Sequence, residues 1–202
     1  VRYKENRGHI VGQNRCFESA QGEWVLFVAN DVRLYDTECI RELYNYATYQ
    51  LFVQKRQVGQ VQPMVLKPDK SIDHYGMSWT WPGYGTGNRW WNSKDSRIEI
   101  VPSTCYLMRK SVWKEVGGFD EGLSTSYEDV DIGIRLQQIG YTNLLWTEAE
   151  ATHLGNATLR HSPTHTRAAF HRDRCYVVKK HYRGFDRWLR LAAIHLIDAL
   201  PR

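Results

Sequence analysis

An uninterrupted apolar run, Trp24-Val25-Leu26-Phe27-Val28-Ala29, ends directly in two polar residues, Asn30 and Asp31. A strand without polar alternation is typical of a sheet that is covered on both faces, as parallel sheets are in α/β folds. In such sheets ligands bind outside the carboxyl ends of the strands. The run therefore predicts an α/β fold and places Asp31 where a functional side chain would lie.

Helix and strand patterns alternate around this run. Apolar residues recur at helical spacing over 9–21 and 36–52, while 58–66 has the pattern of a strand. Pro63 predicts that this strand lies at an edge or ends there, because proline cannot donate to a ladder. Glycine, proline and aromatic residues over 74–97 predict a loop.

The second half of the chain continues the alternation. Strands are expected at 98–101, 104–108, 141–146 and 148–152, and helices at 111–116, 127–139 and 163–182. Ser111 and Ser126 are the expected N-caps, and Pro163 is expected at the first helical position. We expect one domain over 1–160 and a helical extension over 161–202.

Composition narrows the class of protein. A formal net charge of +5 favours anionic partners such as nucleotide phosphates, but without an arginine-rich arm we expect no nucleic acid. The four cysteines form no Cys-x-x-Cys pair, so a zinc ribbon or thioredoxin-like motif is unsupported. Because no signal peptide opens the sequence and no apolar run reaches about 20 residues, we expect a cytoplasmic protein.

Three places carry candidate chemistry. Asp31 suits a hard divalent cation, although for an isolated aspartate a turn or helix-capping role is the simpler explanation. Glu128-Asp129-Val130-Asp131 puts three acids at a helix start, where the helix dipole alone favours them. Their mutual repulsion predicts that at least one pKa rises toward the range of a general base. His153 becomes a ligand only if a metal lies nearby; otherwise it is a surface or core histidine.

The order of short motifs resembles family 2 glycosyltransferases of the GT-A fold, over roughly residues 3–182. The motifs that carry the resemblance are Glu5-Asn6-Arg7-Gly8, Gln13-Asn14-Arg15, Ala20-Gln21-Gly22-Glu23, Asn30-Asp31-Val32, Tyr106-Leu107-Met108-Arg109-Lys110, Glu115-Val116-Gly117-Gly118-Phe119-Asp120-Glu121 and the helix that begins at Glu128-Asp129-Val130-Asp131. The resemblance implies a GT-A-like (Rossmann-like), mixed, mainly parallel sheet flanked by helices. The family usually has two strands and a nucleotide loop before the first motif, so we expect an N-terminally truncated domain.

The resemblance also implies roles for individual residues. Asp31 matches the last acid of the metal motif that binds Mn²⁺ or Mg²⁺, and His153 matches a further metal ligand. Asp129 matches the base that deprotonates the acceptor hydroxyl. Ala29 stands where many members carry the first acid of the metal motif, which leaves more of the metal binding to Asp31. The remaining polar neighbours in these motifs are expected to support the site: Asn30, Glu128 and Asp131.

These roles predict a metal-dependent, inverting glycosyltransferase that moves a sugar from a nucleotide-sugar donor to a saccharide or lipid-linked acceptor. The alternative is a truncated or degenerate GT-A domain that serves as a non-catalytic saccharide-binding or assembly module. A third hypothesis is a metal-dependent hydrolase. It is less favoured because the sequence shows no second cluster of metal ligands.

Two further segments have expected partners. Aromatic faces suit the C–H faces of sugars, so an acceptor platform is expected from Trp79, Trp81, Tyr84, Trp90 and Trp91, with a packed flap as the alternative. The apolar, arginine-flanked segment 185–200 is expected to pack on the domain or on a second copy as a homodimer. A peripheral contact with the cytoplasmic membrane face is the other option.

Overall fold

The structure is a computed structural model that describes residues 7–35, 37–87, 97–124, 126–155 and 163–199, with 163–166 described for their backbone only. Its main sheet has seven strands in the order β1-β8-β3-β9-β2, with β4 on β3 and β7 on β9. The strands are β1 (Trp24–Val28), β2 (Val32–Arg33), β3 (Val58–Leu66), β4 (Ile72–His74), β7 (Arg97–Ile98), β8 (Cys105–Arg109) and β9 (Thr142–His153). The predicted mixed α/β architecture is confirmed.

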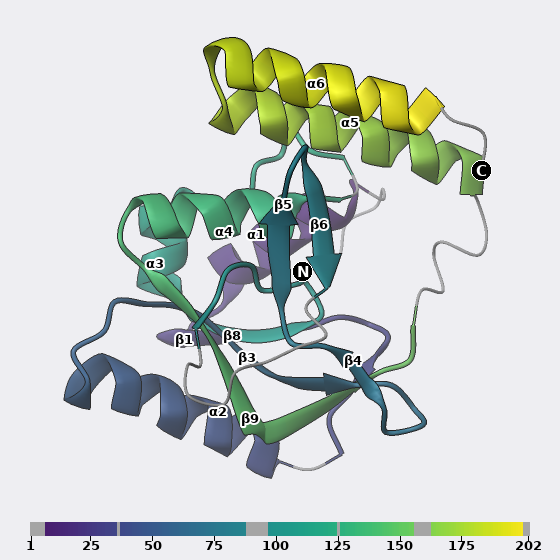
Figure 1. Cartoon of the computed structure of the whole chain (residues 1–202). Coiled ribbons are helices and arrows are strands. Elements are labelled where there is room, and N and C mark those ends of the chain that lie inside the picture. The colour runs from purple at the N-terminus through teal and green to yellow at the C-terminus, as the bar shows by residue number, and fades with distance from the viewer. Residues whose placement is uncertain (1–6, 36, 88–96, 125, 156–162, 200–202) are drawn as a thin grey trace.

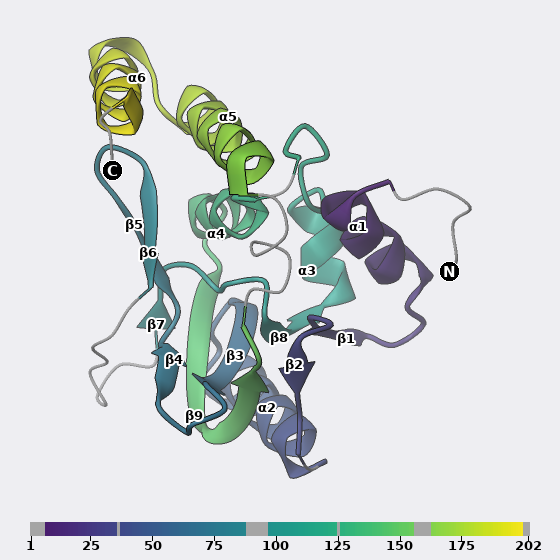
Figure 2. The ribbon, with the colours of Figure 1, turned by 90° about the vertical axis from the view of Figure 1, so that its right-hand side faces the viewer.

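Helices cover both faces of this sheet (Figures 1 and 2). On one face lie α1 (His9–Ser19), α3 (Lys110–Glu115) and α4 (Glu128–Gln138); on the other lies α2 (Glu38–Thr48), which continues into a π-helical turn, Tyr49–Val53. The β8 strand shows the alternation that this requires. Tyr106 and Met108 are buried under the first face, and Leu107 is buried under α2.

The sheet is less parallel than predicted. Among the described strands only β3 and β9 pair in parallel, and the other pairings are antiparallel. The apolar run of β1 pairs antiparallel with β8 at the sheet edge. Val25 and Phe27 pack under one face, while Trp24 and Leu26 pack under the other. A continuous apolar run thus reports that both faces are covered and does not report strand direction.

Pro63 does not mark an edge strand. β3 lies between β8 and β9, and eight of its nine residues are buried. The register of β3 against β9 shifts between Pro63 and Met64. Proline is tolerated at such an irregularity because the ladder is already interrupted there.

The predicted loop over 74–97 contains strands. β5 (Met77–Thr80) and β6 (Tyr84–Gly87) form a two-stranded hairpin, and β4 lies just before it. At the hairpin tip, a Cβ on Gly83 would lie 2.8 Å from Val178 Cγ2 and 3.2 Å from Ile194 Cδ1. The tip therefore approaches the C-terminal helices too closely for a larger residue.

Two predicted caps are wrong, although both helices exist. Arg109 precedes α3 and Tyr127 precedes α4, and neither helix receives a side-chain cap hydrogen bond. Tyr127 takes a left-handed conformation with φ of 65°. The two strands expected over 141–152 form the single strand β9.

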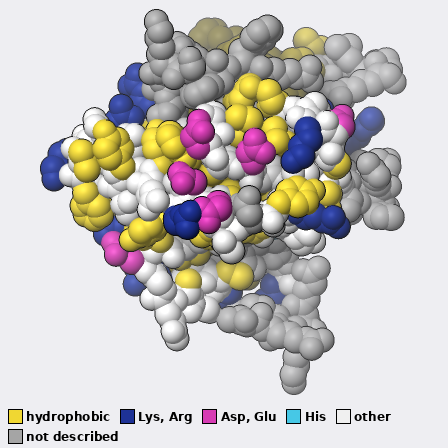
Figure 3. Space-filling view, turned by 90° about the horizontal axis from the view of Figure 1, so that it is seen from below, with side chains coloured by type: hydrophobic (Ala, Val, Ile, Leu, Met, Phe, Trp, Pro, Cys, Tyr) yellow, Lys and Arg dark blue, Asp and Glu magenta, His cyan; other side chains and the backbone are white. Residues whose placement is uncertain are grey.

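The C-terminal helices α5 (Pro163–His181) and α6 (Gly184–Ala199) pack side by side at one end of the molecule (Figure 1). The buried residues of their small apolar cluster are Cys175, Val178 and Ile194. Across the opposite end, which is seen from below in Figure 3, hydrophobic side chains lie scattered among acidic and basic ones. None of the helices in the described part of the chain has the length and apolar content to cross a membrane.

Candidate active site

Asp31 and His153 lie together, as their predicted shared role requires. β2 pairs with the end of β9, with Val32 opposite His153, and the Leu154 N–H donates to the Asp31 carbonyl at 2.7 Å. The Asp31 Oδ2 and His153 Nε2 atoms are 3.3 Å apart. His153 ends the strand that runs parallel to β3, so the pair lies at the carboxyl end of the parallel strands.

A second carboxylate completes this group, and the sequence analysis missed it. Asp73 on β4 approaches the other nitrogen of His153, with Oδ2 and Nδ1 2.8 Å apart. The three side chains of this Asp31–His153–Asp73 cluster are 26%, 15% and 24% exposed, so solvent reaches each of them. The only signal for it in the sequence was the pair Asp73-His74 just after the turn at 67–70.

The cluster has the chemistry of a divalent cation site. An imidazole that donates its Nδ1–H to Asp73 presents the Nε2 lone pair to Asp31, and a cation shared by Nε2 and Oδ2 would satisfy both acceptors. Their separation of 3.3 Å is close to the roughly 3 Å between neighbouring ligands of an octahedral ion with about 2.1 Å bonds. The residues present therefore fit Mn²⁺ or Mg²⁺.

The loop before β8 connects this cluster to Asp129. The Thr104 carbonyl accepts from the Ala29 N–H at 2.8 Å, and the Thr104 hydroxyl lies 3.5 Å from His74 Nε2. Burial lowers the pKa of His74 to about 4, so this histidine is neutral near pH 7. Ser103, the residue before Thr104, donates a backbone hydrogen bond that acts on Asp129.

The three acids at the start of α4 have different surroundings. Asp129 is half-buried and accepts from its neighbour Val130 N–H at 2.8 Å. Burial first, and the adjacent Glu128 carboxylate second, raise the pKa of Asp129 to about 7. One raised pKa in this group was predicted and is confirmed, although burial contributes more than crowding does.

Glu128 is buried and its carboxylate pairs with a histidine of α1. The Glu128 Oε1 atom lies 3.1 Å from His9 Nε2. This hydrogen bond raises the pKa of His9 and outweighs the opposing effect of its burial. Glu128 thus links α4 to α1 and places a negative charge beside Asp129.

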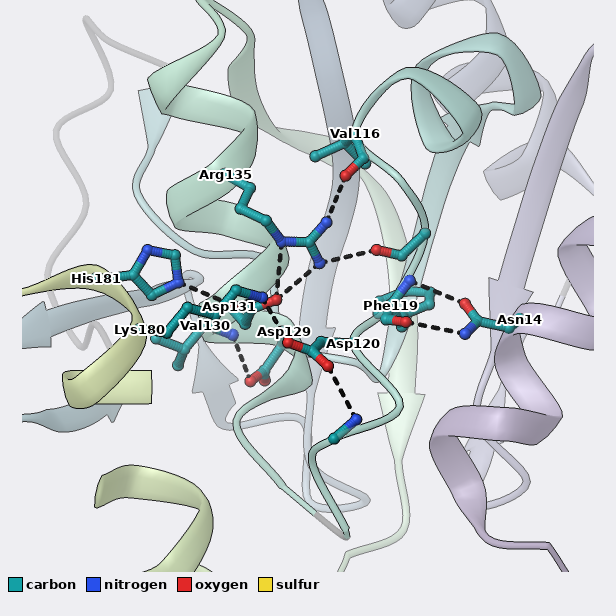
Figure 4. A network of polar contacts seen from close by, with 12 residues as sticks. Asn14, Val116, Phe119, Asp120, Asp129, Val130, Asp131, Arg135, Lys180 and His181 are labelled. Atoms are coloured by element: carbon teal, nitrogen blue, oxygen red, sulfur yellow. Dashed lines mark hydrogen bonds and ion pairs between the residues drawn. The ribbon is translucent and has the colours of Figure 1, made fainter. Parts of the chain in front are cut away.

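Asp131 is fully buried and holds α5 against α4 (Figure 4). Its carboxylate forms ion pairs with Arg135 at 2.7 Å and Lys180 at 2.8 Å, and contacts His181 Nε2 at 2.8 Å. Burial opposes ionisation, but the His181 hydrogen bond and the charges of Arg135 and Lys180 outweigh it and lower the pKa of Asp131 to about 2. Arg135 also donates to the Val116 and Gly118 carbonyls, so the group is a structural anchor.

The aromatic residues expected to bind the acceptor are only partly open. Trp79 donates to the Tyr182 hydroxyl at 2.9 Å and packs in the core. The Tyr84 ring lies under the Arg174 guanidinium at 4.1 Å. Trp81 is 59% exposed at the hairpin tip. Trp90 and Trp91 lie outside the described residues, and an acceptor role for any of the five stays a prediction.

The remaining predicted residue, Asn30, lies beside Asp31 and its side chain is exposed. The structure therefore brings Asp31, His153 and Asn30 to one end of the sheet. The loop at 103–104 connects this end to Asp129, because it contacts both Ala29 and Asp129. The structure separates Asp131 from these residues, on the side of α4 that meets α5.

Comparison with known protein families finds no matching family model. The chain is 27% identical to the O-antigen biosynthesis protein RfbC of Myxococcus xanthus over 73% of its own length and 12% of that protein. It is 32% identical to the N-acetylglucosaminyl-diphospho-decaprenol L-rhamnosyltransferase of Mycobacterium tuberculosis over 43% of its length and 28% of that enzyme. It thus spans less than a third of these relatives.

Solved structures share the fold at low sequence identity. GalNAc-T7 with UDP, GalNAc and Mn²⁺ matches 78% of this chain and 32% of its own, with a TM-score of 0.61 at 12% identity. The mannosyltransferase PcManGT of Pyrobaculum calidifontis, in complex with GDP-Man and Mn²⁺, matches 99% of this chain and 52% of its own, with a TM-score of 0.58 at 13% identity.

This chain has a family 2 glycosyltransferase-like fold of the GT-A type. In this glycosyltransferase-like domain the motifs fall on the elements that carry the candidate site. Asn30-Asp31-Val32 joins β1 to β2, and the acids beginning at Glu128 open α4.

Proposed function

We propose that the chain is the metal-binding and acceptor-activating part of an inverting glycosyltransferase. It would transfer a sugar from a nucleotide-sugar donor to a hydroxyl of a saccharide or lipid-linked acceptor. The observation that carries this proposal is the placement of Asp129, a half-buried acid with a pKa of about 7, one loop away from the Asp31–His153–Asp73 cluster. A base and a cation site close together are what direct displacement requires.

Asp31 and His153 would hold Mn²⁺ or Mg²⁺, and Asp73 would orient His153 through Nδ1. The bound ion supplies charge neutralisation for the diphosphate that leaves. Mn²⁺ accompanies UDP in GalNAc-T7 and GDP-Man in PcManGT, which supports a nucleotide diphosphate and a divalent ion here. A carboxylate oxygen and an imidazole suit Mn²⁺.

Asp129 would accept the proton of the acceptor hydroxyl while that oxygen forms a bond to the anomeric carbon. The bond between the anomeric carbon and the donor diphosphate breaks on the opposite side, which inverts the configuration. A pKa of about 7 suits this role, because the carboxylate is then partly ionised at neutral pH and still a useful proton acceptor.

The acceptor class rests on the relatives. The mycobacterial relative is named for a polyprenyl-diphosphate acceptor, and the myxococcal relative for O-antigen biosynthesis. We propose a hydroxyl of such a saccharide or lipid-linked saccharide, used at the cytoplasmic face of a membrane. The exposed Trp81 ring offers one stacking surface for a sugar.

The test combines nucleotide binding with sugar transfer on the purified chain. Calorimetric titration with UDP, GDP and dTDP should show binding that depends on Mn²⁺ and is lost in Asp31→Asn. Asp129→Asn should keep that binding and lose turnover by about 10²–10⁴-fold, the range expected for a general base. Asp69→Asn, in an exposed turn, is the matched control and should change neither. Unchanged turnover in Asp129→Asn would remove the base assignment.

The second candidate is a non-catalytic saccharide-binding or assembly module, and Ala29 is the observation that favours it. Ala29 provides no carboxylate, and its backbone N–H is used in the bond to Thr104. Absence of Mn²⁺-dependent binding for all three nucleotides, together with retained saccharide binding, would favour this candidate over the enzyme.

A further inference from the structure

A second group of metal-binding side chains lies on the C-terminal helices, away from the Asp31–His153–Asp73 cluster. His171 and Cys175 are one turn apart on α5, and His195 lies opposite them on α6. One ligand atom from each of the three lies within 4.8 Å of the others, and Cys175 Sγ is 3.7 Å from His171 Nε2. Two neighbouring ligands of a tetrahedral zinc ion, with bonds of about 2.0 Å to nitrogen and 2.3 Å to sulfur, are about 3.5 Å apart.

The hydrogen bonds of the two histidines leave suitable nitrogens for a metal. His171 Nδ1 lies 2.5 Å from an Asp198 carboxylate oxygen, and His195 Nδ1 lies 2.6 Å from the Leu191 carbonyl. Both contacts place the proton on Nδ1, so each Nε2 keeps its lone pair. Metal-bound histidines in proteins are oriented in this way, by a carboxylate or a backbone carbonyl on the second nitrogen.

Asp198 is itself held in place by other elements. It pairs with Arg174 of α5 and accepts from the Tyr84 hydroxyl of β6 at 3.3 Å. Arg174 in turn covers the Tyr84 ring. The group that orients His171 is therefore attached to the β5-β6 hairpin as well as to both helices.

The packing between α5 and α6 gives a bound ion a structural purpose. The described apolar cluster there has three buried residues, Cys175, Val178 and Ile194, and Cys175 is also one of the three ligands. So small a cluster contributes little burial free energy. An ion that joins one helix to the other would add to this small apolar contact and to the Asp198 pairs between the helices.

We propose that His171, Cys175 and His195 bind a zinc-type transition-metal ion that links α5 to α6, with a water molecule in the fourth position. A thiolate and two imidazoles select zinc over Mg²⁺ and Mn²⁺, which prefer oxygen. This site is thus chemically distinct from the oxygen-rich cluster at the sheet. The competing explanation is a Cys–His hydrogen-bonded group that holds no ion.

The test uses Co²⁺ as a coloured substitute for zinc, added to the metal-free full chain. Wild-type protein should show a thiolate-to-cobalt charge-transfer band and intense tetrahedral d–d bands, both abolished by equimolar Zn²⁺ and insensitive to Mn²⁺. Cys175→Ser should lose the charge-transfer band. Cys16→Ser, which changes the exposed cysteine of α1, is the matched control and should keep it. A cation at Asp31 and His153 has no thiolate, so it cannot produce this band.

A second variant covers the case in which Cys175→Ser does not fold. His195 is exposed, so His195→Gln should leave the circular dichroism spectrum unchanged and weaken Co²⁺ binding at least ten-fold. Asp198→Asn should weaken it by about 10–100-fold, as loss of an orienting carboxylate does. Absence of the charge-transfer band in wild-type protein, or its persistence in Cys175→Ser, would overturn the proposal. Neither the spectrum nor the Co²⁺ affinity depends on a sugar donor, an acceptor or sugar transfer, so this test is independent of the proposed function.

Discussion

The two sides of the α4 N-terminus give their acids more different pKa values than the sequence indicates. Asp129 and Asp131 are two residues apart in the first turn of the same helix. Yet the pKa of Asp129 is raised to about 7 and that of Asp131 is lowered to about 2. The local sequence favours both anions equally, so the difference comes from what each side of α4 contacts.

On the α5 side, Asp131 meets two cationic side chains and a histidine, and its charge is offset. On the other side, Asp129 meets the Glu128 carboxylate and backbone N–H groups, while His9, which acts on it electrostatically, is hydrogen-bonded to Glu128. Cations around a buried carboxylate lower its pKa and make it an anchor, whereas partial burial beside another carboxylate raises the pKa. The comparison indicates why neighbouring acids in one motif have opposite pKa shifts.

The largest effect on this comparison is expected from removing the anchor. Asp131→Ala leaves the partly buried Arg135 guanidinium and the His181 ring without their buried carboxylate, and breaking such a network costs about 3–5 kcal/mol. Urea unfolding at pH 7 should show this loss of stability. Asp129→Asn, measured beside it, should show no loss. Equal destabilisation by both changes would remove the distinction between the two sides.

The pKa values themselves provide the second test. Carbon NMR titration of the side-chain carboxyls should give about 2 for Asp131 and about 7 for Asp129. Since the folded pKa of Asp131 lies below its ordinary value of 3.8, its stabilisation is complete above about pH 4 and is lost as pH falls toward 2. That loss amounts to about 2 kcal/mol. Similar titration of the two groups would contradict the assignment.

Asp129 should affect stability with the opposite pH dependence. Its folded pKa lies above the ordinary value, so the folded state keeps a proton between about pH 4 and 7 that the unfolded state has released. Asp129 therefore lowers the free energy of unfolding most above pH 7, where it is ionised in the folded state. Asp129→Asn should be more stable than wild type by about 1–2 kcal/mol at pH 8, a shift discounted for partial exposure, and by less at pH 5. Thermal unfolding at the two pH values measures this difference.

The smallest effect is expected from Lys180, which bridges Asp131 and Asp120 from α5. Its side chain is 31% exposed, and Arg135 and His181 remain on Asp131 when it is replaced. Lys180→Met should cost about 1 kcal/mol or less in urea unfolding. Asp186→Asn, which breaks an exposed pair on α6, should cost no more than this. A loss as large as that of Asp131→Ala would mean that Lys180 is the main partner.

Much of the fold follows from patterns that neighbouring residues create. The apolar faces of α1, α2 and α4 and the strands β1, β3, β8 and β9 are visible as periodicity and apolar runs. Strand direction was not visible, since an apolar run reports coverage on both faces alone. The hairpin β5-β6 was also missed, because its glycine and aromatic content resembles that of a loop.

The candidate site divides in the same way. Asp31, Asp129 and His153 are found from motif order, because each belongs to a short local pattern at an element boundary. Asp73 has no such pattern, and it joins His153 only because β4 folds back on β3. The ligand group on α5 and α6 needs two helices to meet, so the spacing of four between His171 and Cys175 alone does not predict it.

The sequence by itself therefore determined the class of fold, the order of the elements and the acids that could carry chemistry. Only the tertiary structure decided which acid has a raised pKa, which is an anchor and which contacts a histidine. The physical reason is that burial and partner charge fix a pKa, and both depend on residues distant in the chain, such as Lys180 and His181 for Asp131.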